Sequence, residues 1–230
     1  MPEQPLVITA GLTRTFGTAT NPVHALRGVN LQISRGVLVG LKGRSGSGKT
    51  TLLNCLGGLD MPTSGEVIFD GKSLSAMSDL ELTVLRRHRI GYVFQSFALM
   101  PLLCALENVE LPLRIAGTPA AEREQRAKEC LEVVGLTKWA NHRPFELSGG
   151  QQQRVAIARA LAVKPDLILA DEPTGELDSR TAMQIIALFR NLVRDHGVAV
   201  CLTTHDPAVE GLADVTYHLA DGVVAEEVAP

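Results

Sequence analysis

The chain has 230 residues, of which 45% are hydrophobic and 20% charged, and its formal net charge is −3. A chain of this size and composition fits one globular domain, or one core with an inserted subdomain, that buries its own apolar side chains. A mildly acidic chain has no bulk electrostatic attraction to nucleic acid or anionic lipid. We therefore expect no nucleic-acid partner, and any phosphate site has to be built locally.

No segment of the chain predicts secretion or membrane insertion. Residues 1–12 lack the basic start of a secretory signal. The longest uncharged stretch, residues 90–106, is shorter than most spanning helices and contains Gln95, Ser96 and Pro101. The four cysteines form no C-x-x-C pair, which is typical of free thiols in a reducing compartment. We therefore expect a soluble, cytoplasmic protein.

Taken in chain order, the predicted elements begin with a strand-rich stretch and continue as alternating strands and helices. Residues 6–34, punctuated by glycine and Asn-Pro, predict a small antiparallel sheet. The alternation beyond them predicts a mostly parallel sheet wrapped by helices. The expected strands are residues 37–41, 67–69, 90–94, 167–170, 198–203 and 215–219. The expected helices are residues 49–59, 120–134, 149–163 and 180–195.

The predicted organisation is one α/β domain that covers residues 1–230. Residues 1–96 and 165–230 form the expected core together with its β subdomain. Residues 97–164 contain no convincing strand, so they predict an inserted α-helical subdomain. Near the C-terminus, Asp221-Gly222 between two apolar runs predicts a hairpin turn.

A glycine-rich motif follows the strand expected at residues 37–41. Its sequence, Gly43-Arg-Ser-Gly-Ser-Gly-Lys49-Thr50, fits the pattern G-x-x-x-x-G-K-[ST], and a helical run follows directly. The glycines let backbone N–H groups converge on an anion, and the helix adds its positive end. A chance glycine-rich turn is the alternative, but it explains neither the strand nor the helix. The motif predicts a phosphate-loop NTPase core. In this core the positive charge of Lys49 binds the outer phosphates, and the Thr50 hydroxyl is a ligand for Mg²⁺. The predicted nucleotide-binding residues are Gly43, Arg44, Ser45, Gly46, Ser47, Gly48, Lys49, Thr50 and Thr51.

Two carboxylates end the apolar strand expected at residues 167–170. In an open parallel sheet, ligands gather at the carboxyl ends of the strands. We expect Asp171 to hold Mg²⁺, directly or through water, and Glu172 to polarise a water molecule aimed at the γ-phosphate. The alternative is a pair of solvated acids, which becomes less convincing with a phosphate loop upstream.

The run Leu147-Ser-Gly-Gly-Gln-Gln-Gln-Arg154 lies between those motifs and opens a predicted helix. Ser148 is a good N-cap, and the two glycines leave backbone amides uncovered at the helix start, which makes a second anion site. A plain capped helix does not need these glycines. The run resembles the LSGGQ signature of the ABC (ATP-binding cassette) ATPase family.

This resemblance extends over roughly residues 6–221 and implies an ATPase that uses ATP and Mg²⁺. In the family, two ATPase subunits pack head to tail, so the signature of one copy would close over the γ-phosphate held by Lys49 of the other. The signature residues so implied are Ser148, Gly149, Gly150 and Gln151. The resemblance also implies integral membrane permease subunits as partners, which would place the protein on the inner face of the cell membrane.

Four further positions match family motifs one by one. Gln95 matches the glutamine that joins the core to the helical subdomain and senses Mg²⁺ or water. His205 matches the switch histidine that orients the attacking water, although a lone histidine there can also be structural. Asp178 matches the aspartate that communicates across the dimer, and Phe16 matches the aromatic residue, usually Tyr, that stacks on adenine. The implied catalytic residues are Lys49, Glu172 and His205, and the implied metal-binding residues are Thr50, Gln95 and Asp171.

Several flanking segments resemble the macrolide-export and lipoprotein-release branch of the family, among them Asp171-Glu-Pro-Thr-Gly and Glu107-Asn-Val-Glu-Leu-Pro-Leu. The function that this implies is ATP-driven export or extraction of a substrate from the membrane. One alternative is an ATPase that drives a membrane partner without transport, in signalling or envelope remodelling. Another is a soluble ABC ATPase acting on nucleic acid or ribosomes, which the single cassette and acidic charge disfavour. We also expect the apolar residues 96–103 to line a groove for a short helix of the permease.

Overall fold

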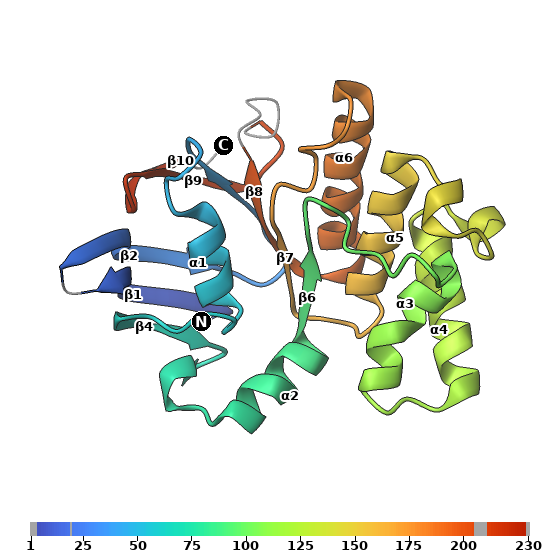
Figure 1. The fold of residues 1–230 in the computed structure, drawn as a ribbon, viewed down its shortest axis with the longest axis horizontal. Coiled ribbons are helices and arrows are strands. Elements are labelled where there is room, and N and C mark those ends of the chain that lie inside the picture. The colour runs from blue at the N-terminus through green and yellow to red at the C-terminus, as the bar shows by residue number, and fades with distance from the viewer. Residues whose placement is uncertain (1–3, 19, 205–210, 229–230) are drawn as a thin grey trace.

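The computed structural model describes residues 4–18, 20–204 and 211–228, with side chains described as far as residue 225 (Figure 1). The strands are β1 Val7–Thr18, β2 Asn21–Ile33, β3 Leu38–Lys42, β4 Ser64–Phe69, β5 Lys72–Ser73, β6 Ile90–Val93, β7 Leu167–Ala170, β8 Ala199–Thr204, β9 Val215–Ala220 and β10 Val223–Val228. The α-helices are α1 Lys49–Leu56, α2 Asp79–Arg89, α3 Ala105–Ile115, α4 Ala120–Val133, α5 Gly149–Leu161 and α6 Ser179–His196. Short 3₁₀ helices occupy Leu74–Ala76, Thr137–Trp139 and Pro144–Glu146.

A sheet in the order β10-β9-β3-β8-β7-β6 forms the centre of the molecule. Strands β9, β3, β8, β7 and β6 run parallel, and β10 pairs antiparallel with β9. The turn between β9 and β10 has positive φ at both Asp221 (50°) and Gly222 (80°), as a type I′ hairpin requires. The mostly parallel sheet and the predicted hairpin are therefore confirmed.

Both faces of this sheet are covered, which explains why its strands read as continuous apolar runs. In β8, Val200 and Leu202 belong to the same buried cluster as Phe189 of α6. Cys201, between them, belongs to a second buried cluster that includes Leu52 of α1. Side chains of successive strand residues point to opposite faces, so α1 covers one face and α5 and α6 cover the other (Figure 1).

The expected antiparallel β subdomain is present as a second sheet in the order β2-β1-β4-β5. Strand β4 pairs antiparallel with β1, Val67 lying opposite Thr9. The segment 67–69 therefore belongs to this sheet and interrupts the strand–helix alternation from which the parallel sheet was predicted. Helix α1 contacts β2 of this sheet and β8 of the parallel sheet, so it lies between the two.

Helices α3, α4 and α5 form the expected helical insert, to the right in Figure 1. The turn before α3 is fixed by Asn108, whose fully buried amide accepts a hydrogen bond from the Met100 N–H and donates to the carbonyls of Met100, Leu103 and Cys104. No helix in the described part of the chain is long and apolar enough to cross a membrane.

Helix α2 was not predicted, although the sequence carries its start signal. Ser78 and Glu81 form a capping box: the Glu81 N–H donates to the Ser78 hydroxyl, and the Ser78 N–H donates to the Glu81 carboxylate. The last residue of α2, Arg89, enters a closed ring of ion pairs in which Arg35 and Arg89 each contact Asp70 and Asp166. This ring ties the antiparallel sheet to the start of β7.

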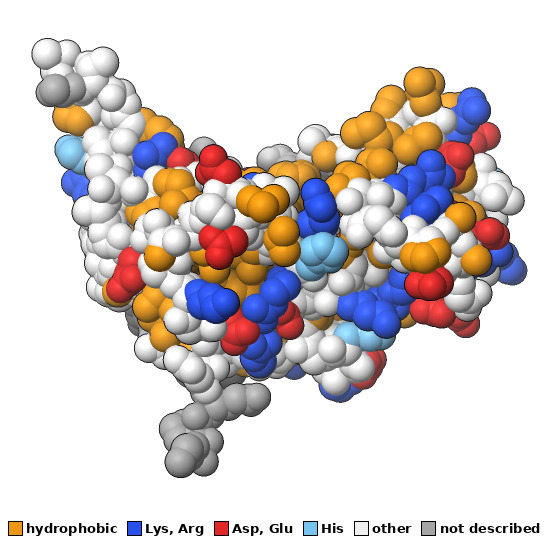
Figure 2. All heavy atoms as spheres, turned by 90° about the horizontal axis from the view of Figure 1, so that it is seen from below, with side chains coloured by type: hydrophobic (Ala, Val, Ile, Leu, Met, Phe, Trp, Pro, Cys, Tyr) orange, Lys and Arg blue, Asp and Glu red, His pale blue; other side chains and the backbone are white. Residues whose placement is uncertain are grey.

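Cationic and anionic side chains are interspersed over the face seen in Figure 2, and the outline is hollowed between two lobes. On this face the two signs of charge are therefore mixed rather than gathered in separate patches.

Candidate nucleotide-binding site

The phosphate loop connects β3 to α1 and curls tightly at its end. Gly48, which precedes the first residue of α1, has φ +104°, a conformation that side chains with a Cβ rarely adopt. A Cβ at Gly48 would also lie 2.5 Å from the Ala25 carbonyl oxygen of β2. The curl therefore depends on glycine, and it directs the N-terminal end of α1 into the loop.

The other loop residues form a rim and a floor. Arg44, Ser45 and Gly46 are exposed and make the rim, and Thr50 and Thr51 continue from Lys49 in the first turn of α1. Ser47 is buried, and its Oγ is without a hydrogen-bond partner among the described residues. A Cβ at Gly43 would lie 2.6 Å from that oxygen, so the floor has no room for a larger residue.

Lys49 places its ammonium group in the middle of the loop. Its side chain is only 5% exposed, and Nζ donates to the carbonyls of Gly43 (2.8 Å) and Arg44 (3.1 Å). Nζ also lies 3.9 Å from Oε1 of Glu172, at the end of β7. The one buried cation of the motif thus lies between the loop and the second acid.

Asp171 and Glu172 follow β7 directly, as expected. The Thr50 hydroxyl donates to Asp171 Oδ1 (3.2 Å), which joins α1 to the end of β7. A hydroxyl and a carboxylate are the oxygen ligands that Mg²⁺ prefers, so this pair fits the ion by its chemistry. Glu172 has φ +42°, a conformation that costs a non-glycine residue about 1–3 kcal/mol and is concentrated at functional sites.

Thr203 of β8, which the sequence analysis did not select, contacts both acids. Its fully buried hydroxyl donates to Asp171 Oδ1 (2.7 Å) and accepts a hydrogen bond from the Glu172 N–H (2.8 Å). The available signal was weak: a threonine at the carboxyl end of a strand adjacent to β7, in the run Thr203-Thr204-His205.

Gln95 follows β6 and lies against the loop that starts at Glu172. Its Nε2 is 3.0 Å from the point where a Cβ on Gly175 would be. Two and three residues further on, Phe97 and Ala98 have positive φ (59° and 49°). Their carbonyls accept hydrogen bonds from Arg159 of α5, at 3.0 Å and 2.5 Å. The glutamine is thus followed by a strained turn that the signature helix holds in place.

Phe16 lies beside the phosphate loop on the neighbouring strand. It pairs with Val23 of β2, and Ala25, two residues further along β2, is the residue that touches Gly48. Two strand residues span about 7 Å. The guanidinium of Arg14 lies 4.4 Å from the centre of the Phe16 ring and is held by Asp60, so it covers one ring face. The ring is 39% exposed, which leaves surface for a stacking partner.

The signature residues form a second cluster at the start of α5. Ser148 and Gln151 make a capping box: the Gln151 N–H donates to the Ser148 hydroxyl (3.4 Å) and the Ser148 N–H donates to Gln151 Oε1 (2.9 Å). Gly150 lies so close to α6 that a Cβ would be 2.5 Å from Cγ2 of Thr181. Asp178 caps α6 by accepting from the N–H (3.0 Å) and hydroxyl (2.6 Å) of Thr181.

These signature residues and Asp178 line a hollow of about 290 Å³. Among the described residues, no hydrogen bond joins this cluster to the phosphate loop. The loop from Glu172 to Asp178 connects the two clusters, and the fully buried Gln153 of α5 donates to the Pro173 carbonyl within it (2.6 Å). His205 lies outside the described residues.

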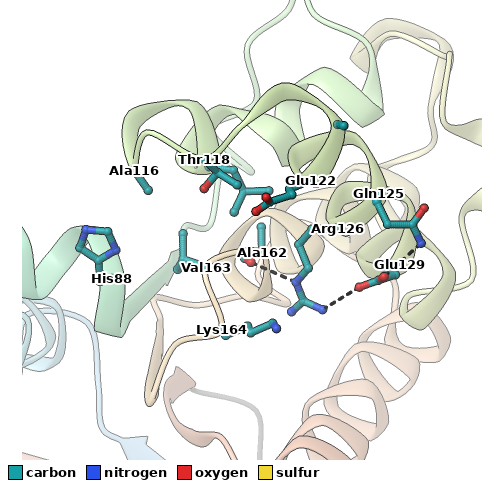
Figure 3. Close-up of a pocket in the computed structure, with 12 residues that line it drawn as sticks. His88, Ala116, Thr118, Glu122, Gln125, Arg126, Glu129, Ala162, Val163 and Lys164 are labelled. Carbon is teal, nitrogen blue, oxygen red and sulfur yellow. Dashed lines mark hydrogen bonds and ion pairs between the residues drawn. The ribbon is translucent and has the colours of Figure 1, made fainter.

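A further hollow of about 560 Å³ lies away from both clusters, between the ends of α2, α3, α4 and α5 (Figure 3). Its most buried cation, Arg126, donates to the carbonyls of Leu161 and Ala162 at the C-terminus of α5 and pairs with Glu129. Because the guanidinium already stabilises that helix end, this hollow is not part of the candidate site.

Comparison with protein families matches residues 26–175 to the model described as ABC transporter. The chain belongs to the ABC transporter family. It is an ATP-binding and ATP-hydrolysing cassette, and its fold is that of the family. The ABC transporter ATP-binding protein MJ0796 of Methanocaldococcus jannaschii is 50% identical over 220 residues, or 94% of either chain. Its solved structure, a dimeric post-hydrolysis state bound to ADP and Pi, superposes with a TM-score of 0.88 over 97% of this chain and 98% of that one, at 47% identity.

Two further relatives confirm the expected branch. The lipoprotein-releasing system ATP-binding protein LolD of Bacteroides fragilis is 45% identical over 92% of this ABC cassette and 96% of its own length. The macrolide export ATP-binding/permease protein MacB of Marinobacter nauticus is 46% identical over 99% of this cassette, which spans only 35% of MacB. The predicted family, its branch and the ATPase activity are therefore confirmed, and the roles of individual residues stay predictions.

Proposed function

We propose that this ABC cassette binds Mg²⁺–ATP between its phosphate loop and the two acids after β7. One observation supports this above the others. The Lys49 ammonium and the Thr50 hydroxyl, one residue apart at the start of α1, reach Glu172 (3.9 Å) and Asp171 (3.2 Å), respectively. The phosphate-binding and acidic motifs, far apart in sequence, therefore meet in one place.

In this proposal each residue has a distinct role. Amides of residues 43–51 and Lys49 bind the phosphates, and Phe16 stacks on adenine with the ring face that Arg14 leaves open. Thr50, Asp171 and Gln95 hold Mg²⁺, which when bound neutralises charge on the phosphate oxygens. Glu172 accepts a proton from the attacking water, and His205 orients that water.

The signature cluster completes the site of a second copy. Ser148, Gly149, Gly150 and Gln151 present the start of α5 beside a 290 Å³ hollow, and an exposed helix start attracts anions. The solved relative MJ0796 is dimeric. We propose that two copies pair head to tail, that each signature closes over the γ-phosphate on the partner's Lys49, and that Asp178 lies at the pairing surface.

The glutamate-to-glutamine variant Glu172→Gln tests this arrangement. It retains the shape of the carboxylate but cannot accept the proton, so turnover falls by about 10²–10⁴ while ATP binding persists and pairs of cassettes accumulate. Light scattering after gel filtration with Mg²⁺–ATP measures the pairing. The control is Glu132→Gln, at an exposed carboxylate of α4. Wild-type turnover in Glu172→Gln would exclude Glu172 as the base.

The membrane partner is proposed to bind an apolar groove of about 420 Å³ between α2, β6, α3 and α5. Phe94, Ala98, Leu111 and Ile115 contribute to its lining. The loop expected to line this groove, residues 96–103, contributes only Ala98: Leu99 packs against the core, and Leu102 is 80% exposed elsewhere. The groove therefore depends on β6 and α3 more than on the loop.

Ile115 is 60% exposed, so Ile115→Asp can be made without emptying the core. We expect this variant to keep its stability and to lose co-sedimentation with membranes that contain the permease. Leu102→Asp is the matched control, since it places the same charge at an apolar, exposed position outside the groove. Equal loss in both variants, or loss in neither, would contradict the groove assignment.

The relatives LolD and MacB favour a task at the inner face of the cell membrane: extraction or export of a membrane-embedded substrate through integral permease subunits. A membrane partner that is driven without transport would use the same ATPase cycle. Release of substrate from vesicles that contain the permease, dependent on ATP, separates the two tasks.

A further inference from the structure

We infer that Thr203 is a positioning residue that sets both acids of the ATPase site through a single hydroxyl group. The inference rests on the proposed function, because it takes Asp171 and Glu172 as the acids of hydrolysis. It adds a residue outside the phosphate loop, the acid pair and the signature.

The hydroxyl of Thr203 both donates and accepts a hydrogen bond at the acid pair. It donates its proton to Asp171 Oδ1 (2.7 Å) and accepts a hydrogen bond from the Glu172 N–H (2.8 Å). Since the residue is fully buried, water cannot replace either partner. The two hydrogen bonds therefore fix the Asp171 carboxylate and the Glu172 backbone relative to the same point on β8.

This fixation matters most at Glu172, whose backbone has φ +42°. A glutamate in this region persists only where its surroundings hold it there. On the N-terminal side that support is the Thr203 hydroxyl, and on the C-terminal side it is the Gly175 N–H, which donates to the Glu172 carbonyl (3.0 Å). Loss of the first support lets the Glu172 side chain leave the position that faces Lys49.

At Asp171 the Thr203 hydroxyl binds one of the two carboxylate oxygens. Thr203 and Thr50 both donate to Oδ1, at 2.7 Å and 3.2 Å. Oδ1 of Asp171 is thus held from two elements, β8 and α1. Groups that orient a functional carboxylate in this way commonly contribute about 10–100-fold to activity.

The test compares Thr203→Val, which keeps the shape but lacks the hydroxyl, with Thr203→Ser, which keeps it. We expect Thr203→Val to lower kcat by about 10–100-fold, with the Kd for a fluorescent ATP analogue changed by less than about 3-fold. Thr203→Ser should stay within about 3-fold of wild type in kcat. Amide hydrogen exchange at Glu172 should be faster in Thr203→Val than in Thr203→Ser, a readout independent of turnover.

Thr9→Val is the matched control. The Thr9 hydroxyl is also buried in a strand, donates to the Val29 carbonyl (3.1 Å) and accepts from the Leu31 N–H (2.9 Å), but it lies in the antiparallel sheet. This variant should lose stability and keep wild-type kcat. If Thr203→Val does not fold, the pair Thr203→Ser and Thr203→Ala, which differ by one oxygen atom, replaces it with the same expected ratio.

Wild-type kcat in Thr203→Val, or an equal loss in Thr203→Val and Thr203→Ser, would overturn the inference. Wild type and Glu172→Gln are measured in parallel. Normal turnover in wild type and its loss in Glu172→Gln preserve the proposed function even where the Thr203 variants refute the positioning role.

Discussion

The start of α5 packs against the start of α6 with no space for a side chain, and this contact predicts different outcomes at two adjacent glycines. A Cβ at Gly150 would lie 2.5 Å from Cγ2 of Thr181, whereas a Cβ at Gly149 would lie 3.4 Å from the nearest atom, on Leu177. Thr181 cannot rotate away without loss, because its hydroxyl donates to Asp178 Oδ2 at 2.6 Å. The clash at Gly150 therefore has to separate the two helices.

The magnitude follows from two opposing terms. Replacement of a helical glycine by alanine stabilises by up to about 1 kcal/mol, and this gain applies to both positions. Overpacking destabilises by about 1–3 kcal/mol, and this loss applies to Gly150 alone. We expect Gly150→Ala to be about 1–3 kcal/mol less stable than Gly149→Ala. In a chain of this length that difference is about 2–4 °C in Tm per kcal/mol.

Thermal and urea unfolding of both variants measure the difference. Thr181→Ser supplies the decisive control, since serine retains the hydroxyl that binds Asp178 and lacks Cγ2. In the Thr181→Ser background the clash is absent, so Gly150→Ala should cost little stability there. The double variant Gly150→Ala/Thr181→Ser should therefore be nearly as stable as Thr181→Ser alone. Equal stability of the two alanine variants, or no recovery in the double variant, would refute the packing argument.

Three further predictions concern charge and reactivity. Lys49→Ala removes the buried ammonium from the phosphate loop, so ATP affinity in a fluorescence titration should fall by about 10–100-fold; unchanged affinity would remove Lys49 from the site. Hydrogen bonds from Arg89 and then Arg35 hold the pKa of Asp70 below its usual range. The stabilisation that Asp70 provides is therefore present above its unfolded pKa of about 3.9 and is lost as pH falls through the lower folded pKa. Asp70→Asn should be less stable than wild type at pH 7, by less than about 1 kcal/mol because the ring is partly exposed, and the difference in Tm should vanish in acid. Burial raises the pKa of the Cys201 thiol, whereas Cys104 is only half-buried, so a maleimide reagent followed by mass spectrometry should label Cys104 first in the native protein.

Much of the fold could be predicted because its local signals agree with its tertiary packing. The strand at residues 167–170 was predicted with the bounds that β7 has, since its apolar run is buried on both faces. Segment 67–69 was placed in the wrong sheet, because three apolar residues predict a strand but carry no information about its partner. Helix α2 was missed because it buries only Leu82 and Leu85 and so lacks a long apolar stripe, although its capping box was readable.

The candidate site also contains residues that the sequence predicts and contacts that it does not predict. Glycine, lysine and paired acids follow from the chemistry of phosphate, so the sequence alone was enough to predict them. The supporting contacts could not be predicted in this way. Thr203, Arg14 and Gln153 are hydrogen-bonded to partners 20 to 46 residues away in the chain, and their residue types are ordinary in strands and helices. Only the sheet order β3-β8-β7 brings Thr203 next to Asp171.

The two ends of helix α5 contact two different functional segments. Its 13 residues make a stiff rod of about 20 Å. One end carries the LSGGQ amides, and the other grips the strained turn after Gln95 through Arg159. A displacement of that turn by an occupant of the groove would therefore move α5 as a rigid body, and its signature end would move with it without unwinding of the helix. Movement of the groove occupant and closure of the signature over the nucleotide of a second copy would then be coupled through one rigid helix.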